Sequence, residues 1–287
     1  MDQINNKLFF SALLSIVFWT ISCEDDLAPV PNADMIVVRG YIYAGQPVTD
    51  VNLASTLELD DESETAIPID SAEVILKRGT EEFVLVPVHS YDTTETDTTF
   101  GITYVYPDTD LVVAAGDTFI LEVNYGEQHL TAETMVPTRP DSFTSTVDTL
   151  RVPKFDRWRD YIQWIFADSN IVHLNWDNPN DEYHYLMMDN VEEDPQPLER
   201  TLPPRWRRFI SQPFVDTSYT MLASTITHFG RHDIVLFHVQ PDYVLLYQSS
   251  GQNSRDLNEP YSNINGGLGM FTAFNSDTVS IVLLPEK

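Results

Sequence analysis

Cysteine is almost absent from this chain of 287 residues, in which Cys23 is the only one. A single cysteine excludes an intramolecular disulfide and a structural zinc site built on several thiolates. The fold must therefore be held by its hydrophobic core alone. Cys23 also has a distinctive position, because it closes the apolar run from Leu8 to Ile21 and is followed at once by Glu24-Asp25-Asp26.

Long apolar runs are missing too. The run from Leu8 to Ile21 is shorter than the about 20 residues that a membrane-spanning helix needs. It fits the apolar region of a secretory signal, which has roughly 7–15 residues. A lone cysteine after such a run is typical of a lipoprotein. We therefore expect residues 1–22 to be a signal peptide, Cys23 to carry acyl chains and residues 23–34 to form a tether; an uncleaved anchor or a plain secretory signal is the alternative.

Basic side chains are scarce, with 16 Lys and Arg against 44 Asp and Glu, for a net charge of -28. Such a chain is repelled by nucleic acid and by an anionic membrane surface, so we expect no nucleic-acid partner. The acids form a solvated surface or, alternatively, bind calcium. Acid-rich stretches such as Glu58–Glu64 lack the ordered ligand spacing of a calcium loop, and no metal site is assigned.

Catalytic signatures are absent from the sequence. His228 and His232 are four residues apart, but no glutamate follows His228 and Gly230 would interrupt a helix between them, which excludes the usual zinc-protease motif. The glycines of the segment 266–269 lack the spacing of a dinucleotide-binding loop. We assign no catalytic residue and no cofactor. The sequence instead predicts a structural turn formed by Asn263, Gly266, Gly267 and Gly269, with glycine supplying positive φ.

Short alternating apolar segments separated by turn residues fill most of the remaining chain, which predicts an all-β fold. The clearest hairpin joins residues 118–125 and 128–136 through Gly126-Glu127. The acidic segments 52–70 and 90–99 are predicted to be loops, and residues 240–251 to form the single helix. The other strands are expected at residues 35–43, 72–77, 82–88, 101–106, 143–152, 171–176, 183–189, 233–239 and 278–284.

Pro137 and Pro140 interrupt the strand pattern near the middle of the chain. We place a domain boundary there, with an N-terminal β-domain at residues 35–139 and a C-terminal one at 140–287. The first is expected to be an immunoglobulin-like or transthyretin-like β-sandwich. The second is expected to be a β-domain that carries one helix.

Two short segments combine basic and aromatic side chains within this acidic chain. Arg157 and Trp158 lie in the first, and Arg205, Trp206 and Arg208 lie in the second. Arginine and tryptophan are the residues that most often anchor interfaces, so the five are predicted to form one partner-binding surface. Alternatively, the tryptophans contribute to the core and the arginines pair with nearby acids.

The segment S-N-I-N-G-G-L-G-M-F at residues 262–271, the segments V-V-R-G-Y-I at 37–42 and A-G-D-T-F-I-L-E-V at 115–123, and the signal-like N-terminus carry a resemblance. Together they resemble a family of Gram-negative outer-membrane lipoproteins of unknown function. Its members share the C-terminal motif S-N-I-x-G-G-L-G-x-F and are commonly encoded beside TonB-dependent receptors. The acids Glu24-Asp25-Asp26 are similar to the surface-export signal of such lipoproteins.

The resemblance implies a lipid-anchored protein of the outer membrane that faces the extracellular side. Its expected role is that of a non-catalytic accessory or binding subunit of a TonB-dependent nutrient uptake system, with the receptor as its partner. Two alternatives stay open, a hydrolase acting on surface glycans and a structural component of the envelope. The family supplies no catalytic residues.

Overall fold

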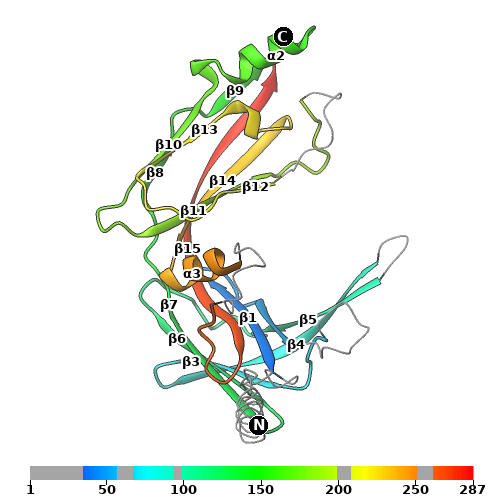
Figure 1. Ribbon diagram of the computed structural model, residues 1–287, viewed down its shortest axis with the longest axis vertical. Helices are drawn as coiled ribbons and strands as arrows, with labels where there is room; N and C mark the ends of the chain where they lie inside the picture. Colours follow the sequence, from blue (N-terminus) through cyan, green and yellow to red (C-terminus); the bar gives the residue numbers. More distant parts are fainter. Residues whose placement is uncertain (1–34, 57–66, 94–97, 199–207, 251–260, 287) are drawn as a thin grey trace, which may run out of the picture. The chain divides into compact units, whose positions relative to one another are not determined.

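The computed structural model describes residues 35–56, 67–93, 98–198, 208–250 and 261–286 (Figure 1). The signal-like segment, Cys23 and the tether lie outside these residues. The described chain is an all-β structure, as predicted. Its strands are β1 (Ile36–Tyr43), β2 (Asp50–Ser55), β3 (Glu73–Arg78), β4 (Glu81–Thr93), β5 (Thr98–Val105), β6 (Thr118–Tyr125), β7 (Gln128–Met135), β8 (Asp141–Ser145), β9 (Thr149–Val152), β10 (Val172–Asp177), β11 (Tyr183–Asn190), β12 (Arg208–Ile210), β13 (Ser218–Met221), β14 (Gly230–Val239) and β15 (Leu268–Pro285).

Most strands belong to one large sheet, in the order β12-β11-β14-β15-β1-β2-β5-β4-β3-β6-β7, with β9 added alongside β15. The strands β13, β10 and β8 form a second, smaller sheet. The predicted hairpin is present as β6 and β7, and Gly126 at its turn has φ 59°. Alternating burial of successive residues is typical of these strands. In β1, for example, every second residue from Ile36 onward is buried.

The strand β15 connects the two halves of the described chain (Figure 1). It pairs in parallel with β1 at its beginning, in antiparallel with β14 from Phe274 onward, and in parallel with β9 near its end. Phe271 and Ala273 therefore belong to the core of the first half, and Ile281 and Leu283 to the core of the second. Asp34–Lys287 forms one compact unit, and the division into two domains at residue 139 stays a prediction.

Several predicted elements differ from the structure. Two α-helices are described where one was expected: α3 (Pro241–Ser250) matches the prediction, whereas α2 (Trp158–Ile165) was missed. Tyr161, Trp164 and Ile165 are the buried side chains of α2, and their spacing is helical. The basic residues around this short helix obscured that pattern.

The two predicted loops are also corrected in part. Residues 52–55 belong to β2, where Val51 and Leu53 are buried, and the neighbouring acids masked this short alternation. Residues 90–93 and 98–99 continue β4 and β5, because the threonines there pair across the hairpin as strand residues. The strand expected at residues 143–152 is divided between β8 and β9.

The glycine-rich turn leads into β15 and packs against β1 and β7. Gly266 and Gly269 have φ 86° and 108°, which L-residues rarely adopt. A Cβ on Gly269 would collide with the backbone oxygen of Val38. Gly267 has no positive φ, but a Cβ there would lie 2.8 Å from the backbone oxygen of Ile36. Two of the three sequence segments quoted for the family resemblance are thus neighbours in the sheet, with Val38 opposite Gly269.

Asn263 holds the same turn through its side-chain amide. Its Oδ1 accepts a hydrogen bond from the Phe271 N–H at 2.9 Å, and its Nδ2 donates to the Phe271 carbonyl at 2.8 Å. Asn265 exchanges two backbone hydrogen bonds with Thr131 on β7. The turn is therefore fixed to both β15 and β7, which explains a structural role for Asn263.

We predict that Gly269→Ala destabilises the fold much more than Gly45→Ala. Both positions have positive φ, which costs about 1–2 kcal/mol for alanine. Only Gly269 adds a collision with backbone, whereas a Cβ on Gly45 meets nothing within 4 Å. Urea titration measures both free energies of unfolding. Equal losses for the two variants would contradict a packing role for Gly269.

Candidate ligand-binding cleft

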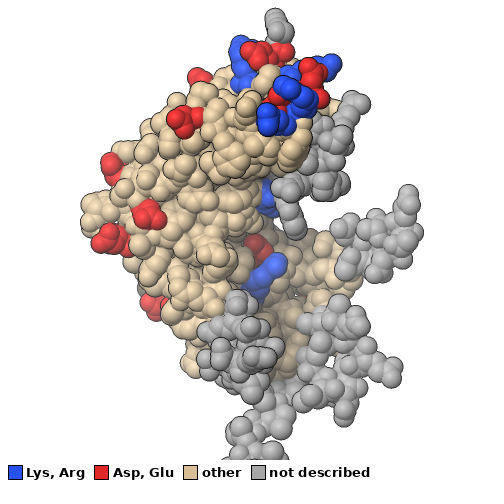
Figure 2. All heavy atoms as spheres, turned by 45° about the horizontal axis from the view of Figure 1, so that its top comes forward, with Lys and Arg blue, Asp and Glu red and all other residues tan. Residues whose placement is uncertain are grey.

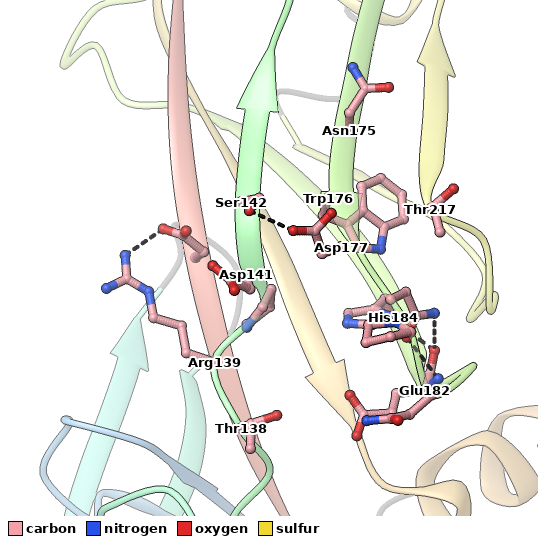
Figure 3. A pocket seen from close by; sticks show the side chains of 15 residues that line it. Thr138, Arg139, Asp141, Ser142, Asn175, Trp176, Asp177, Glu182, His184 and Thr217 are labelled. Carbon is pink, nitrogen blue, oxygen red and sulfur yellow. Dashed lines mark hydrogen bonds and ion pairs between the residues drawn. The ribbon is translucent and has the colours of Figure 1, made fainter.

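A cleft of about 1250 Å³ lies where the β7–β8 link, the end of β10 and the start of β11 meet (Figure 3). The strands β8, β10, β11 and β15 and the segments that connect them form its walls. The residues that line it are Thr138, Arg139, Pro140, Asp141, Ser142, Asn175, Trp176, Asp177, Asn178, Pro179, Asn180, Glu182, His184, Thr217 and Asp277.

The loop between β10 and β11 is held by Asn178. Its Nδ2 donates to the carbonyls of Glu182 and Val215 at 3.0 and 3.2 Å, and its Oδ1 accepts from the Glu182 N–H at 2.9 Å. The buried Asn178 amide thus supplies hydrogen-bond partners to backbone groups of the loop, which in a sheet would pair with a neighbouring strand. The cleft wall is therefore fixed by hydrogen bonds as well as by strands.

Backbone strain is concentrated at this cleft. Ser142 and Asp181, with φ 58° and 53°, are the non-glycine residues with positive φ in the described part of the chain. Ser142 lines the cleft, and Asp181 lines the smaller cavity beside it. Such conformations cost on the order of 1–3 kcal/mol each and occur preferentially at functional sites. The strain therefore favours this cleft as the functional site of the described chain.

Four carboxylates line the cleft. Asp141 on β8 and Asp177 on β10 are direct cross-strand partners. The Ser142 hydroxyl donates to Asp177 at 2.7 Å, and Arg139 pairs with Asp277 at 2.6 Å (Figure 3). No Lys or Arg among the described residues forms an ion pair with Asp141 or Asp177. Like charges directly opposite each other on neighbouring strands repel, so this pair attracts a cation.

Two buried histidines lie against each other beside the cleft. The rings of His184 and His238 have centroids 5.1 Å apart. Each Nδ1 lies within hydrogen-bond distance of a backbone carbonyl, that of Glu182 for His184 and that of Thr138 for His238, so each Nδ1 carries a hydrogen. Burial, and then the proximity of His238, lower the pKa of His184 to about 4. His184 is therefore neutral at neutral pH.

Trp176 leaves a polar group without a partner at the cleft wall. Its side chain is 3% exposed and packs against Phe143, Phe214 and His184. The indole N–H is buried and has no hydrogen-bond partner among the described residues. Figure 3 shows this nitrogen on the edge of the ring that faces His184. A buried donor of this kind costs about 1–3 kcal/mol when it is left unpaired.

A second cavity of about 490 Å³ adjoins the cleft and shares Thr138, Asn180 and Glu182 with it. Its walls are mainly apolar, in contrast to those of the main cleft. The apolar side chains that contribute are Met135, Val136, Pro137, Tyr183, Val239 and Pro241. We call this second cavity the apolar annex.

Sequence reasoning did not single out any of these cleft residues. The polar turn D-N-P-N-D-E at residues 177–182 and the prolines at 137 and 140 marked two loops, but nothing indicated that they meet. Their proximity depends on strand register, which is set by contacts between distant parts of the chain. Among the described residues, no group of three or more His, Cys, Asp or Glu is arranged to hold a metal ion. The acidic stretch Glu58–Glu64, which was considered for calcium, lies outside the described residues.

Only part of the predicted partner surface lies within the described residues. Arg157 precedes α2 and pairs with Asp160, and Trp158 is 58% exposed. Arg208 lies on β12 and pairs with Asp189 at 2.6 Å. Arg205 and Trp206 lie outside the described residues. Figure 2 shows basic and acidic side chains gathered together over the end that carries α2. The joint surface stays a prediction.

A protein family described as a domain of unknown function, DUF4249, matches residues 23–280. The chain belongs to this family. The match covers both halves of the fold and the glycine-rich turn of this DUF4249 chain. No curated protein matches it.

The solved structures that resemble this DUF4249 chain include domains A168–A170 of titin. The TM-score is 0.20 and the sequence identity 10%, over 87% of this chain and 66% of the titin fragment. The described residues include no helix that is long and apolar enough to cross a membrane.

We predict that His184 makes stability fall as the pH decreases from about 6.5 to 4. In this pH window His184 binds a proton in the unfolded chain but stays neutral in the folded one. Acid therefore favours unfolding. The shift corresponds to on the order of 3 kcal/mol. In urea titrations at several pH values, His184→Gln should flatten this dependence.

A remaining slope is expected because burial also lowers the pKa of His232. Exposed His173 provides the comparison, because His173→Gln removes a histidine that the fold does not bury. An unaltered slope in His184→Gln would show that His184 does not titrate as its burial implies.

Proposed function

We propose that this protein is a surface-exposed outer-membrane lipoprotein that binds a ligand as a non-catalytic subunit of a TonB-dependent nutrient uptake system. The observation that carries the proposal is the cleft, which combines a large volume with strained backbone at its rim. Ligand sites are typically preformed cavities with a few polar groups fixed in place. The anchor and the receptor come from the sequence resemblance.

The hydrogen bonds in the cleft favour binding over nucleophilic catalysis. The Ser142 hydroxyl donates to the Asp177 carboxylate and not to an imidazole. The Nδ1 of His184 is committed to a backbone carbonyl. A serine nucleophile needs a base within hydrogen-bond reach that is itself oriented by a third group. This arrangement is not present among the described cleft residues.

One observation favours the alternative of a glycan hydrolase. Asp141 and Asp177 are cross-strand partners within the cleft. Glycosidases use a pair of carboxylates roughly 5–9.5 Å apart. Two neutralising variants therefore separate the alternatives, because Asp141→Asn and Asp177→Asn would each abolish hydrolysis in a glycosidase. The role of a structural envelope component predicts no effect of cleft variants at all.

We expect Cys23→Ala to release the protein from membranes. Each buried CH₂ of an acyl chain contributes about 0.8 kcal/mol, so loss of the chains removes the anchor. Cell fractionation and immunoblotting measure the distribution. Protease added to intact cells should digest the wild type, whereas replacing Glu24, Asp25 and Asp26 with alanine should protect it. A Cys23→Ala variant that stays in the outer membrane would refute lipid anchoring.

We also expect a tagged wild-type chain to recover a TonB-dependent receptor from solubilised outer membranes. Trp158→Ala should reduce this recovery at least tenfold if its exposed ring is an interface anchor. Tyr125→Ala, at another exposed aromatic, is the control. Circular dichroism checks the fold. Two results together would favour the hydrolase over the proposed function. The receptor would be absent from the wild-type isolate, and the protein would hydrolyse glycans in a way that depends on Asp141.

A further inference from the structure

We propose that the cleft binds a short peptide segment in which a lysine or arginine lies next to an apolar residue. This inference rests on the proposed function, in that it takes the cleft as the ligand site. It adds the chemical class of the ligand. Three features of the site carry it, namely carboxylates without a basic partner, the adjoining apolar annex and the exposed amides of Asn175 and Asn180.

The charge of the cleft selects a cation. Arg139 is the single Lys or Arg among its lining residues, and it is already paired with Asp277. Asp141 and Asp177 are exposed cross-strand partners that form no ion pair with Lys or Arg among the described residues, and Glu182 lies 3.7 Å from the Nε2 of His238. An amino or guanidino group between the carboxylates would relieve their repulsion. An anionic ligand would increase it.

The apolar annex selects a ligand with an apolar group close to that cation. Glu182 and Asn180 line both cavities, so a ligand that reaches Glu182 stands at the entrance to the annex. Met135, Val136 and Val239 contribute apolar surface there. Burying one leucine-sized side chain contributes about 1.5–3 kcal/mol. Adjacent basic and apolar side chains of a peptide satisfy both cavities.

The backbone of a peptide suits the third feature. Asn175 and Asn180 are exposed cleft residues, and each side-chain amide offers an acceptor oxygen and two donor hydrogens. An extended peptide carries the complementary N–H and C=O groups along its backbone.

Other ligand classes fit less well. A neutral sugar would leave the Asp141–Asp177 repulsion in place, and the Trp176 ring is too buried to offer a stacking face. A bare metal ion lacks a three-ligand group among the residues that the structure describes. A simple organic amine satisfies the carboxylates but neither the annex nor the exposed amides. A peptide satisfies all three features.

The test uses isothermal titration of the acylated protein in detergent with blocked tetrapeptides. The probe is alanine-lysine-leucine-alanine, and its two relatives carry glutamine in place of lysine or serine in place of leucine. The glutamine peptide should bind at least tenfold more weakly than the probe. The serine peptide should also bind about tenfold more weakly, since it loses the apolar group.

Variants assign each contact. Asp141→Asn should lower the affinity for the lysine probe at least tenfold and leave the affinity for the glutamine peptide unchanged. Met135→Ser should abolish the preference for leucine over serine. Asp148→Asn is the matched control, because Asp148 is an exposed acid outside both cavities. It should bind the probe like the wild type.

Equal affinity for the lysine and glutamine peptides would overturn the inference. So would the absence of binding by any peptide, or binding of methylammonium as tightly as the probe. If the peptides fail while receptor recovery persists, the ligand class is wrong and the proposed function survives. If peptides bind but no receptor is recovered, the cleft assignment survives and the uptake role fails.

Discussion

The parallel pairing of β1 with β15 is the constraint on which the rest of the structure depends. Val37–Tyr43 and Leu268–Phe274 lie side by side although more than two hundred residues separate them. The pairing requires glycine at position 269, where the backbone of Val38 leaves no room for a Cβ, and Asn263 to hold the preceding turn. Both cores then form around the same strand, because Phe271 enters one and Ile281 the other.

The cleft follows from this shared strand. Beyond Phe274, β15 leaves β1 and continues beside β14, and Asp277 projects into the cleft just after that point. The β7–β8 link crosses here too, which brings Arg139 to Asp277 and Asp141 to Asp177. The charged groups are thus mounted on strands anchored in two cores. This rigidity explains how strained backbone at Ser142 and unpaired carboxylates persist.

Much of the fold was predictable from the sequence, because alternation of apolar residues is a local signal. It located β1, the β6–β7 hairpin and β14, whereas the proline and glycine at the two ends of segment 240–251 predicted the helix α3. The glycine-rich turn was recognisable because only glycine suits such conformations. The pairing partners were not predictable. Nothing local indicates that Val38 faces Gly269 or that Asp141 faces Asp177, since register arises from the packing of distant segments. The cleft residues were therefore missed, although the loops that carry them were identified.

The shared strand also determines the order in which this chain completes its fold. Neither core is finished until residues 264–283 are in place, since each takes side chains from that segment. Contacts this distant in sequence form slowly, because a long loop must close before they stabilise anything. The earlier strands therefore stay incompletely packed until residues 264–283 have been added to them. A chain that lacks β15 would therefore leave both cores open, because each would lose the side chains that this one strand contributes.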